Sequence, residues 1–391
     1  MKTYRPMYDR TWKEHLMTFE NPDRPVVMVV YGTRPEAIKV APVIRALEAV
    51  EDLGVYTVVT AQHREMLDQV NEMFSIRPDS DLNLMAHGQT LNQLASNVIR
   101  QMDAVYEREQ PAAVLVQGDT TTVMAAAISA FNREIPVVHL EAGLRSGDIR
   151  SPFPEEANRK LVSQLASIHL APTEESKRNL LAEGIDEATV SVTGNTVIDA
   201  LKWAVNQKKS FSNPSLTRIP SDARVVLVTA HRRENLGPNM ERIGQALRIL
   251  AQKYRDVVFV WPAHKNPRVR EIIAPVIRDC TNVLQIEPVA YDEFALLIAR
   301  ASIVLTDSGG LQEEAPSLGK PVLVMRDNTE RPEALAAGTV KLIGADTGRI
   351  VDEVSLLLNS SEAYLKMSNA SNPYGDGQAA VRVVEALRLA V

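Results

Sequence analysis

The sequence predicts an α/β protein built from two doubly wound parallel-sheet domains that face each other across a cleft. The chain has 391 residues, which is too long for one ordinary core. Short runs of β-branched residues recur along it and are separated by longer amphipathic stretches. Alternating strands and helices form parallel sheets with right-handed crossovers. A polar stretch near the middle divides the runs into two similar sets, and each set predicts one domain.

Twelve runs have the length of a buried parallel strand, about 4–6 residues. The six in the first half are Val26–Val30, Val55–Thr60, Ala113–Gln117, Val137–Leu140, Ile168–Leu170 and Val190–Thr193. The six in the second half are Val225–Thr229, Val257–Trp261, Val283–Ile286, Ile303–Thr306, Val322–Met325 and Val340–Ile343. Amphipathic stretches such as Leu91–Glu109 and Met240–Tyr254 predict the helices between them.

The domain boundaries follow from changes in composition. Residues 1–25 are charged and aromatic without the apolar run of a signal peptide, and they predict a surface arm. We expect one Rossmann-like domain over 26–205 and a second over 223–370. Between them, Asn206–Asp222 is polar, contains two prolines and lacks a helical period, so it predicts a linker. Residues 371–391 predict a C-terminal helix that can cross back to the first domain.

Charge and cysteine content exclude several classes of function. The formal net charge is −6, which argues against broad nucleic-acid binding but leaves room for a small anionic ligand. The single cysteine, Cys280, rules out an internal disulfide framework and fits a reducing, cytoplasmic compartment. No apolar run approaches the roughly 18 residues that would predict membrane insertion.

Ligands of such sheets bind at the carboxyl ends of strands, so functional residues are expected in the segments that follow the predicted strands. Gly32 follows the first strand, and Arg34 and Lys39 place two cations beside a helix N-terminus, which suits a phosphate. The alternative is a capped turn with solvated charges. The Gly-x-Gly-x-x-Gly fingerprint of nicotinamide binding is absent at this position, and no cofactor or metal is expected.

Acidic residues follow two further strands of the first half. Asp119 comes after Ala113–Gln117, either as a helix N-cap or as a catalytic acid or base. Glu141 ends an apolar strand, where an unpaired carboxylate is costly, so it is either paired or functional with a raised pKa. Two prolines around Phe153 stiffen a loop that presents Glu155 and Glu156, and one of these two glutamates is expected to begin a helix, where the dipole favours negative charge.

In the second half, His231 follows a strand directly and precedes Arg232, which favours a functional over a structural histidine. The Ser308–Gly310 turn offers bare backbone N–H groups and a hydroxyl that can hold a diphosphate. Glu314, one turn later, can accept hydrogen bonds from both hydroxyls of a ribose. Arg331 is a second candidate phosphate cation. The alternative for this turn is a tight loop followed by an acidic first helical turn.

These motifs together resemble the bacterial non-hydrolysing UDP-N-acetylglucosamine 2-epimerases. The segments that carry the resemblance are GTRPEAIK, TAQHREMLDQV, GDTTT, EAGLRSGD, SPFPEEANR, TGNTVIDAL, HRREN, TDSGGLQEEAPSLGKPVLVMRDNTERPE and NPYGDGQA. It extends from about Val26 to the C-terminus. The resemblance implies a glycosyltransferase-B type fold, reversible conversion of UDP-GlcNAc to UDP-ManNAc, no redox cofactor and a homodimer.

The resemblance also implies roles for individual residues. The catalytic set is Asp119, Glu141, Glu155 and His231. The substrate-binding set is Arg34, Lys39, Phe294, Ser308, Gly309, Gly310, Glu314 and Arg331. A regulatory set, which would bind UDP-GlcNAc as an allosteric activator, is Gln62, His63, Gln89, Arg232 and His264. Val289 departs from the glutamine common in the family, which matters for base binding only if that contact is made by the side chain.

The chemistry explains why three acids are needed. Loss of UDP from C1 makes the C2 hydrogen acidic, elimination gives 2-acetamidoglucal, and re-addition with the proton on the other face gives the epimer. Three rivals remain: a glycosyltransferase of the same fold, which needs at most one base; a hydrolysing epimerase; and a nucleotide-sugar sensor. The expected downstream role is supply of an envelope polysaccharide.

Overall fold

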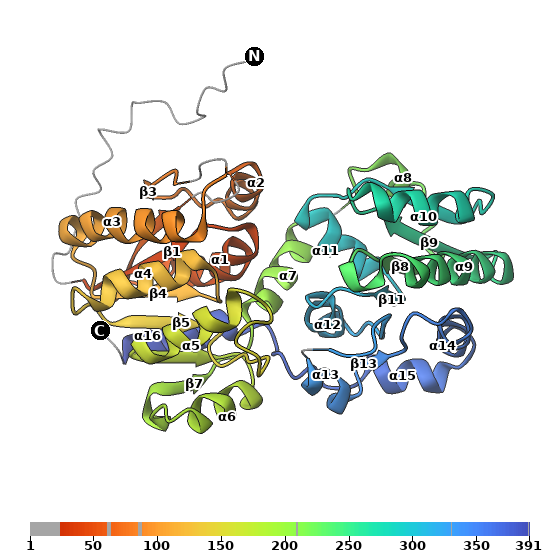
Figure 1. Ribbon diagram of the computed structural model, residues 1–391. Helices are drawn as coiled ribbons and strands as arrows, with labels where there is room; N and C mark the ends of the chain where they lie inside the picture. The colour runs from red at the N-terminus through yellow and green to blue at the C-terminus, as the bar shows by residue number, and fades with distance from the viewer. Residues whose placement is uncertain (1–23, 61–63, 85–87, 209, 330, 390) are drawn as a thin grey trace, which may run out of the picture.

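The computed structural model describes residues 24–391 except 61–63, 85–87, 209, 330 and 390. Two α/β domains lie side by side, each built around one twisted sheet, with α7 and α11 between them (Figure 1). All pairs of neighbouring strands in both sheets are parallel within the described residues. The predicted fold class, two Rossmann-like domains of the glycosyltransferase-B type, is confirmed.

The first sheet contains, within the described chain, seven strands in the order β3-β2-β1-β4-β5-β6-β7. They are β1 (Val26–Tyr31), β2 (Gly54–Val59), β3 (Ser80–Asp81), β4 (Ala113–Gln117), β5 (Val137–Leu140), β6 (Ile168–Ala171) and β7 (Val190–Val192). The sequence predicted six of these strands. The seventh, β3, is a polar edge strand of two residues and carries no apolar pattern that could reveal it.

Helices cover both faces of the first sheet. One face packs against α1 (Arg34–Glu48), α2 (Arg64–Phe74), α7 (Thr196–Gln207) and α16 (Ala379–Arg388). The other packs against α3 (Leu91–Glu109), α4 (Thr121–Phe131) and α5 (Glu155–Leu165). Beside β7 lie α6 (Glu174–Ala182) and the 3-10 turn Glu187–Thr189. Because strand residues alternate between two apolar layers, β1 is apolar throughout and β4 is apolar up to Gln117 at its carboxyl end.

The second sheet has six strands in the described chain, ordered β10-β9-β8-β11-β12-β13. They are β8 (Arg224–Thr229), β9 (Val257–Pro262), β10 (Val283–Ile286), β11 (Ile303–Thr306), β12 (Val322–Val324) and β13 (Val340–Leu342). One face packs against α9 (Pro238–Lys253), α10 (Pro267–Ile277) and α14 (Thr347–Asn359), with α15 (Ser361–Ser368) beside α14. The other packs against α11 (Tyr291–Arg300), α12 (Leu311–Glu314) and α13 (Pro332–Ala337).

The two domains are joined by more than a flexible linker. The segment expected to be a linker continues α7 as far as Gln207 and then contains the short helix α8 (Pro214–Thr217), which an Asn213 cap and a proline at its start explain. Helix α7 packs against α11, and one apolar core runs through this contact from the first domain to the second. Figure 1 shows α16, in blue, lying within the first domain. There it packs on α1 and α7, and Asp199 accepts its first backbone N–H groups.

No helix in the described part of the chain is both long and apolar enough to cross a membrane.

Candidate active site

The loops singled out by sequence meet at the switch point of each sheet. In the first sheet the strand order reverses between β1 and β4, and in the second between β8 and β11. Loops at such a point diverge and leave a crevice at the carboxyl ends of the strands. Gly32 follows β1 here, and a Cβ at this position would lie 2.1 Å from Thr60 Oγ1, so close packing requires the glycine.

Glu141 is both paired and electrostatically unusual. It lies directly after β5 with a φ of 66°, a left-handed conformation that is costly for a residue with a side chain. Lys39 of α1 and Gln117 at the end of β4 both donate hydrogen bonds to its Oε2. Burial raises the pKa of Glu141 above the ordinary carboxyl value, although Lys39 acts in the opposite direction. Burial thus favours the protonated form of this carboxyl, and the ion pair with Lys39 favours the charged form.

Asp119 does not cap helix α4. Thr120 takes that place, because its hydroxyl accepts the N–H of Val123. The Asp119 carboxylate instead forms an ion pair with Arg159 of α5, whose Nε and Nη2 lie 2.9 and 2.6 Å from Oδ2. Arg159 also binds Glu156, a carboxylate with no solvent exposure. A guanidinium shared by two carboxylates fixes the direction in which Asp119 points.

Glu155 and Glu156 both lie in the first turn of α5, where the helix dipole favours negative charge. They differ in their surroundings. Glu156 is buried against Arg159, whereas Glu155 is half-buried and its carboxylate forms no hydrogen bond or ion pair with another residue that the structure describes. Phe153 in the preceding loop is 71% exposed. The structure thus leaves Glu155 as the accessible member of the pair.

His231 is held by a buried aspartate that sequence reasoning did not single out. Asp307, which follows β11 and has no solvent exposure, accepts the backbone N–H groups of His231 and Arg232 and lies 3.4 Å from the His231 ring Nδ1. Burial lowers the pKa of His231; Asp307 acts against this shift, and His264 and Arg232 reinforce it. Burial therefore favours the neutral imidazole when no anion is bound.

The Ser308–Gly310 turn lies between two arginine side chains. A Cβ at Gly309 would lie 3.2 Å from Arg232 Nη2 and 3.3 Å from Arg331 Nη1. Arg331 is held in turn by Glu313, whose Oε1 accepts its Nε at 2.7 Å. Bare backbone flanked by two guanidinium groups is a suitable binding place for a diphosphate.

Glu314 lies beside this turn and faces the first domain. Its Oε1 accepts the Tyr291 hydroxyl at 3.0 Å. Burial raises the pKa of Glu314 to about 7; the charge of Glu313 adds to this, while Lys39 and Arg34 of the first domain oppose it. Arg34 also lines a cavity of about 30 Å³ together with Tyr291 and other residues of α2 and α11. Residues of the first domain therefore reach the second domain's predicted ribose site.

This geometry agrees with what similarity to known proteins shows. A sequence profile described as UDP-N-acetylglucosamine 2-epimerase matches residues 45–388. The chain belongs to the UDP-N-acetylglucosamine 2-epimerase family. An epimerase is an isomerase, so the chain is an enzyme of that class. It is 50% identical over 368 residues to the UDP-N-acetylglucosamine 2-epimerase of Escherichia coli K12, covering 93% of this chain and 98% of that one.

Other members of the family confirm the match. The Bacillus subtilis 168 enzyme is 49% identical over 361 residues, covering 92% of this chain and 94% of its own. Among solved structures, the Neisseria meningitidis UDP-GlcNAc 2-epimerase bound to UDP-GlcNAc superposes with a TM-score of 0.84 at 49% identity, over 93% of this chain and all of that one. The Methanocaldococcus jannaschii enzyme in complex with UDP-GlcNAc and UDP gives 0.75 at 34% identity, over 93% and 99%.

The predicted regulatory residues of this epimerase are only partly described. Gln62 and His63 lie outside the described residues. Gln89 is half-buried immediately before Thr90, the cap of α3. Arg232 and His264 lie beside His231, the predicted catalytic histidine: the His264 and His231 rings stack with centroids 5.3 Å apart, and Arg232 reaches Gly309. Phe294, of the substrate-binding set, is half-buried in α11 and packs against the apolar core.

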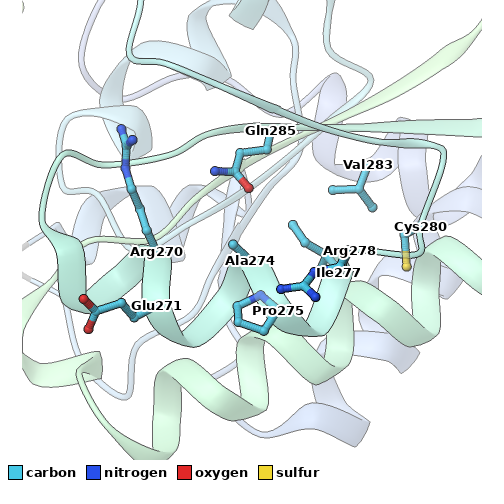
Figure 2. A pocket seen from close by; sticks show the side chains of 9 residues that line it. All are labelled: Arg270, Glu271, Ala274, Pro275, Ile277, Arg278, Cys280, Val283 and Gln285. Carbon is cyan, nitrogen blue, oxygen red and sulfur yellow. The ribbon is translucent and has the colours of Figure 1, made fainter.

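A larger concavity of the epimerase lies elsewhere and lacks this chemistry. A surface groove of about 530 Å³ lies between α10 and strand β10, and Figure 2 shows the residues that line it, such as Arg270, Pro275, Cys280 and Gln285. It follows the side of an edge strand, and its lining includes none of the predicted site residues. Among the residues that the structure describes, no group of three or more His, Cys, Asp or Glu side chains could hold a metal ion.

Proposed function

We propose that this epimerase interconverts UDP-GlcNAc and UDP-ManNAc by eliminating UDP to form 2-acetamidoglucal and then adding UDP back. The observation that carries the proposal is that acids of the first domain, which can move a proton, lie close to the turn of the second domain that can bind a diphosphate. The acids Asp119 and Glu141 follow strands of the first sheet, and the charge of Lys39 beside them acts on Glu314, next to the diphosphate turn of the second sheet.

The reaction needs a leaving group stabilised at C1 and a proton moved at C2. The C1–O bond breaks and its electron pair leaves with the β-phosphate of UDP, while a carboxylate takes the C2 proton. Arg331, Arg232 and the N–H groups of Ser308–Gly310 stabilise the charge that develops on the diphosphate. Re-addition reverses both steps: a proton is delivered to the opposite face of C2, and the β-phosphate of UDP forms a new bond to C1.

The three acids differ in whether a cation holds the side chain in place. Arg159 holds the Asp119 carboxylate in one direction, so Asp119 is suited to act as a base on one face of the sugar. The raised pKa of Glu141 and its bond to Lys39 suit it to share or orient a proton. Glu155, which has no ion pair among described residues, is the second candidate for proton exchange with C2.

His231 steadies the departing phosphate. Its Nδ1 faces Asp307, so its Nε2 is the nitrogen available to a ligand. A bound diphosphate raises the pKa of a neighbouring imidazole, and the resulting imidazolium donates to the phosphate oxygen that leaves C1. The proposed substrate site is completed by Phe294, Arg34 and Lys39. Lys39 contributes to it while it donates a hydrogen bond to Glu141.

Two regulatory and cellular roles complete the proposal. The stacking of His264 on His231, with Arg232 beside Gly309, supports a second UDP-GlcNAc molecule that activates the enzyme from next to the substrate. We further propose a cytoplasmic homodimer whose product supplies an envelope polysaccharide.

Positional isotope exchange tests the bond that breaks. UDP-GlcNAc carrying ¹⁸O in the bridge between C1 and the β-phosphate is incubated with the enzyme and followed by ³¹P NMR. Scrambling of the label into the non-bridging β-phosphate oxygens is expected, because free UDP rotates before it adds back. Epimerisation without scrambling would overturn the elimination, and release of free ManNAc would favour the hydrolysing rival.

A further inference from the structure

Glu313 is a buried carboxylate that the roles above do not use. It lies in α12, next to the predicted ribose ligand Glu314, and is 3% exposed. Its two oxygens have separate partners. Oε1 accepts Arg331 Nε at 2.7 Å, and Oε2 accepts Asn195 Nδ2 at 2.9 Å. Arg331 belongs to the second domain and Asn195 to the first, so one carboxylate connects the diphosphate arginine to the opposite domain.

The orientation of Asn195 is fixed by its other bond. Its Oδ1 caps helix α7 by accepting the N–H of Val197 at 3.0 Å, so the amide NH₂ must be the end that faces Glu313. Asn195 is 4% exposed, and its backbone N–H donates to the carbonyl of Tyr374 in the segment that returns to the first domain. A capped, buried amide is a rigid donor, and its position is set by the first domain alone.

A second carboxylate makes a similar interdomain bond without an arginine. Glu333 of α13 accepts the Thr173 hydroxyl at 2.9 Å and the Tyr374 hydroxyl at 3.1 Å. Thr173 also caps a first-domain helix, α6, by accepting the N–H of Ser176. Glu333 therefore provides a built-in comparison: it has the same kind of contact between the domains, but among the described residues it forms no ion pair with a cation at the diphosphate turn.

We propose that Glu313 is a positioning residue that sets the Arg331 guanidinium for the diphosphate only while its other oxygen is bound by Asn195. The inference rests on the proposed diphosphate role of Arg331. When the domains separate at this contact, Glu313 loses one of two partners and is free to change rotamer with Arg331. Binding of the diphosphate and closure of the two domains are then favoured together, because each holds the same carboxylate in place.

The charge of Glu313 also reaches the proton-handling side of the cleft. Burial lowers the pKa of Lys39, but the charges of Glu141 and Glu313 outweigh it, so the net shift is upward. Glu313 likewise adds to the rise in the pKa of Glu141 that burial begins. The same carboxylate that positions the leaving-group cation therefore helps to keep Lys39 charged beside the catalytic acid.

A polarity swap tests the link between the domains. Glu313→Gln retains size but turns one acceptor into a donor that opposes the Asn195 amide. Asn195→Asp still caps α7, since aspartate caps as well as asparagine, but sets two carboxylates against each other. In the double variant, the new amide at 313 donates to the new carboxylate at 195 while its oxygen still faces Arg331. Affinity for UDP is measured by calorimetry, together with kcat and KM for UDP-GlcNAc.

Each single substitution is expected to weaken UDP binding about tenfold, and the double variant is expected to return to within about twofold of the parent. Glu333→Gln, the matched control, is expected to change UDP affinity less than about twofold. The proposal is overturned if the single variants bind UDP normally, if the double variant is as weak as the product of the two, or if Glu333→Gln is as weak as Glu313→Gln. Asn195→Ser, which also caps α7 but cannot donate an amide N–H, replaces Asn195→Asp if the latter does not fold.

A separate variant distinguishes failure of this inference from failure of the proposed function. Arg331→Ala is expected to weaken UDP binding at least as much as Glu313→Gln. Normal UDP binding by Arg331→Ala would contradict the diphosphate site itself. Weak binding by Arg331→Ala with normal binding by Glu313→Gln would contradict only the positioning role of Glu313.

Discussion

The raised pKa of Glu314 predicts that UDP binding weakens as the pH falls through neutrality. Ribose hydroxyls donate hydrogen bonds and are accepted best by the ionised carboxylate. Burial raises the pKa of this carboxyl to about 7 in the free protein. Below that pH the group must release its proton before it can accept from the ribose, so binding competes with protonation. The perturbation to make is therefore a change of pH, with Glu314→Gln as the matched control.

The magnitude follows from the pKa. With a pKa of about 7, roughly nine-tenths of the carboxyl is ionised at pH 8 and roughly one-tenth at pH 6. The affinity for UDP should therefore fall about tenfold between these pH values through this group alone. An exposed glutamate with the ordinary carboxyl pKa would give almost no change over the same range. His231 acts in the opposite direction, because its imidazolium form favours the diphosphate, and this contribution is common to both proteins.

Isothermal titration calorimetry of UDP at pH 6, 7 and 8 measures the effect. The ratio of parent to Glu314→Gln affinity is expected to rise about tenfold from pH 6 to pH 8, with Glu314→Gln about tenfold weaker at pH 8. The reasoning is refuted if the affinities of parent and variant change in parallel with pH. It is also refuted if the variant binds as tightly as the parent at pH 8, because Glu314 would then not contact the ribose.

Three further substitutions separate the other parts of the site. Lys39→Met leaves the buried Glu141 carboxyl without its cation, so kcat should fall about a hundredfold and the acid limb of the pH–rate profile should move to higher pH. An acid limb at the same pH as in the parent would contradict the pairing of Lys39 with Glu141. Arg159→Leu leaves the carboxylates of Asp119 and the fully buried Glu156 without their cation, so the free energy of unfolding in urea titrations should drop by about 3 kcal/mol and kcat should fall. Arg159→Lys keeps the positive charge and should retain part of the stability and part of the activity. Gly309→Ala should weaken UDP binding about tenfold, because the new methyl group displaces two flexible guanidinium groups, and the melting temperature should stay within about 2 °C of the parent value. A large loss of stability with normal UDP binding would contradict the diphosphate site.

The fold was largely predictable because its signals are local. Buried parallel strands are short apolar runs, and they appear in the sequence with nearly the bounds that the structure gives. Strand β3 escaped because Ser80 and Asp81 form a polar edge. The continuity between domains also escaped, since the contact of α7 with α11 joins residues about a hundred positions apart, and a stretch rich in polar residues gave no sign of it.

The site was predictable where a residue directly follows a strand, and less so where its partner is distant in sequence. Asp119 and Glu141 were singled out by their strand ends, but the ion pair that Asp119 forms depends on Arg159, 40 residues later in the chain. Asp307 had the same strand-end signal as these acids and could have been singled out. Glu313 could not, because nothing in its local sequence shows that its carboxylate meets a helix cap in the other domain.

The most direct test of the proposed mechanism is transfer of a solvent proton to C2. UDP-GlcNAc is incubated with the enzyme in D₂O and followed by ¹H NMR, at a low concentration and at an excess that would also fill the proposed activator site. The account predicts UDP-ManNAc that carries deuterium at C2, and slower incorporation when Asp119, Glu141 or Glu155 is replaced by its amide. UDP-ManNAc that retains the C2 hydrogen, or normal incorporation by all three amide variants, would contradict it.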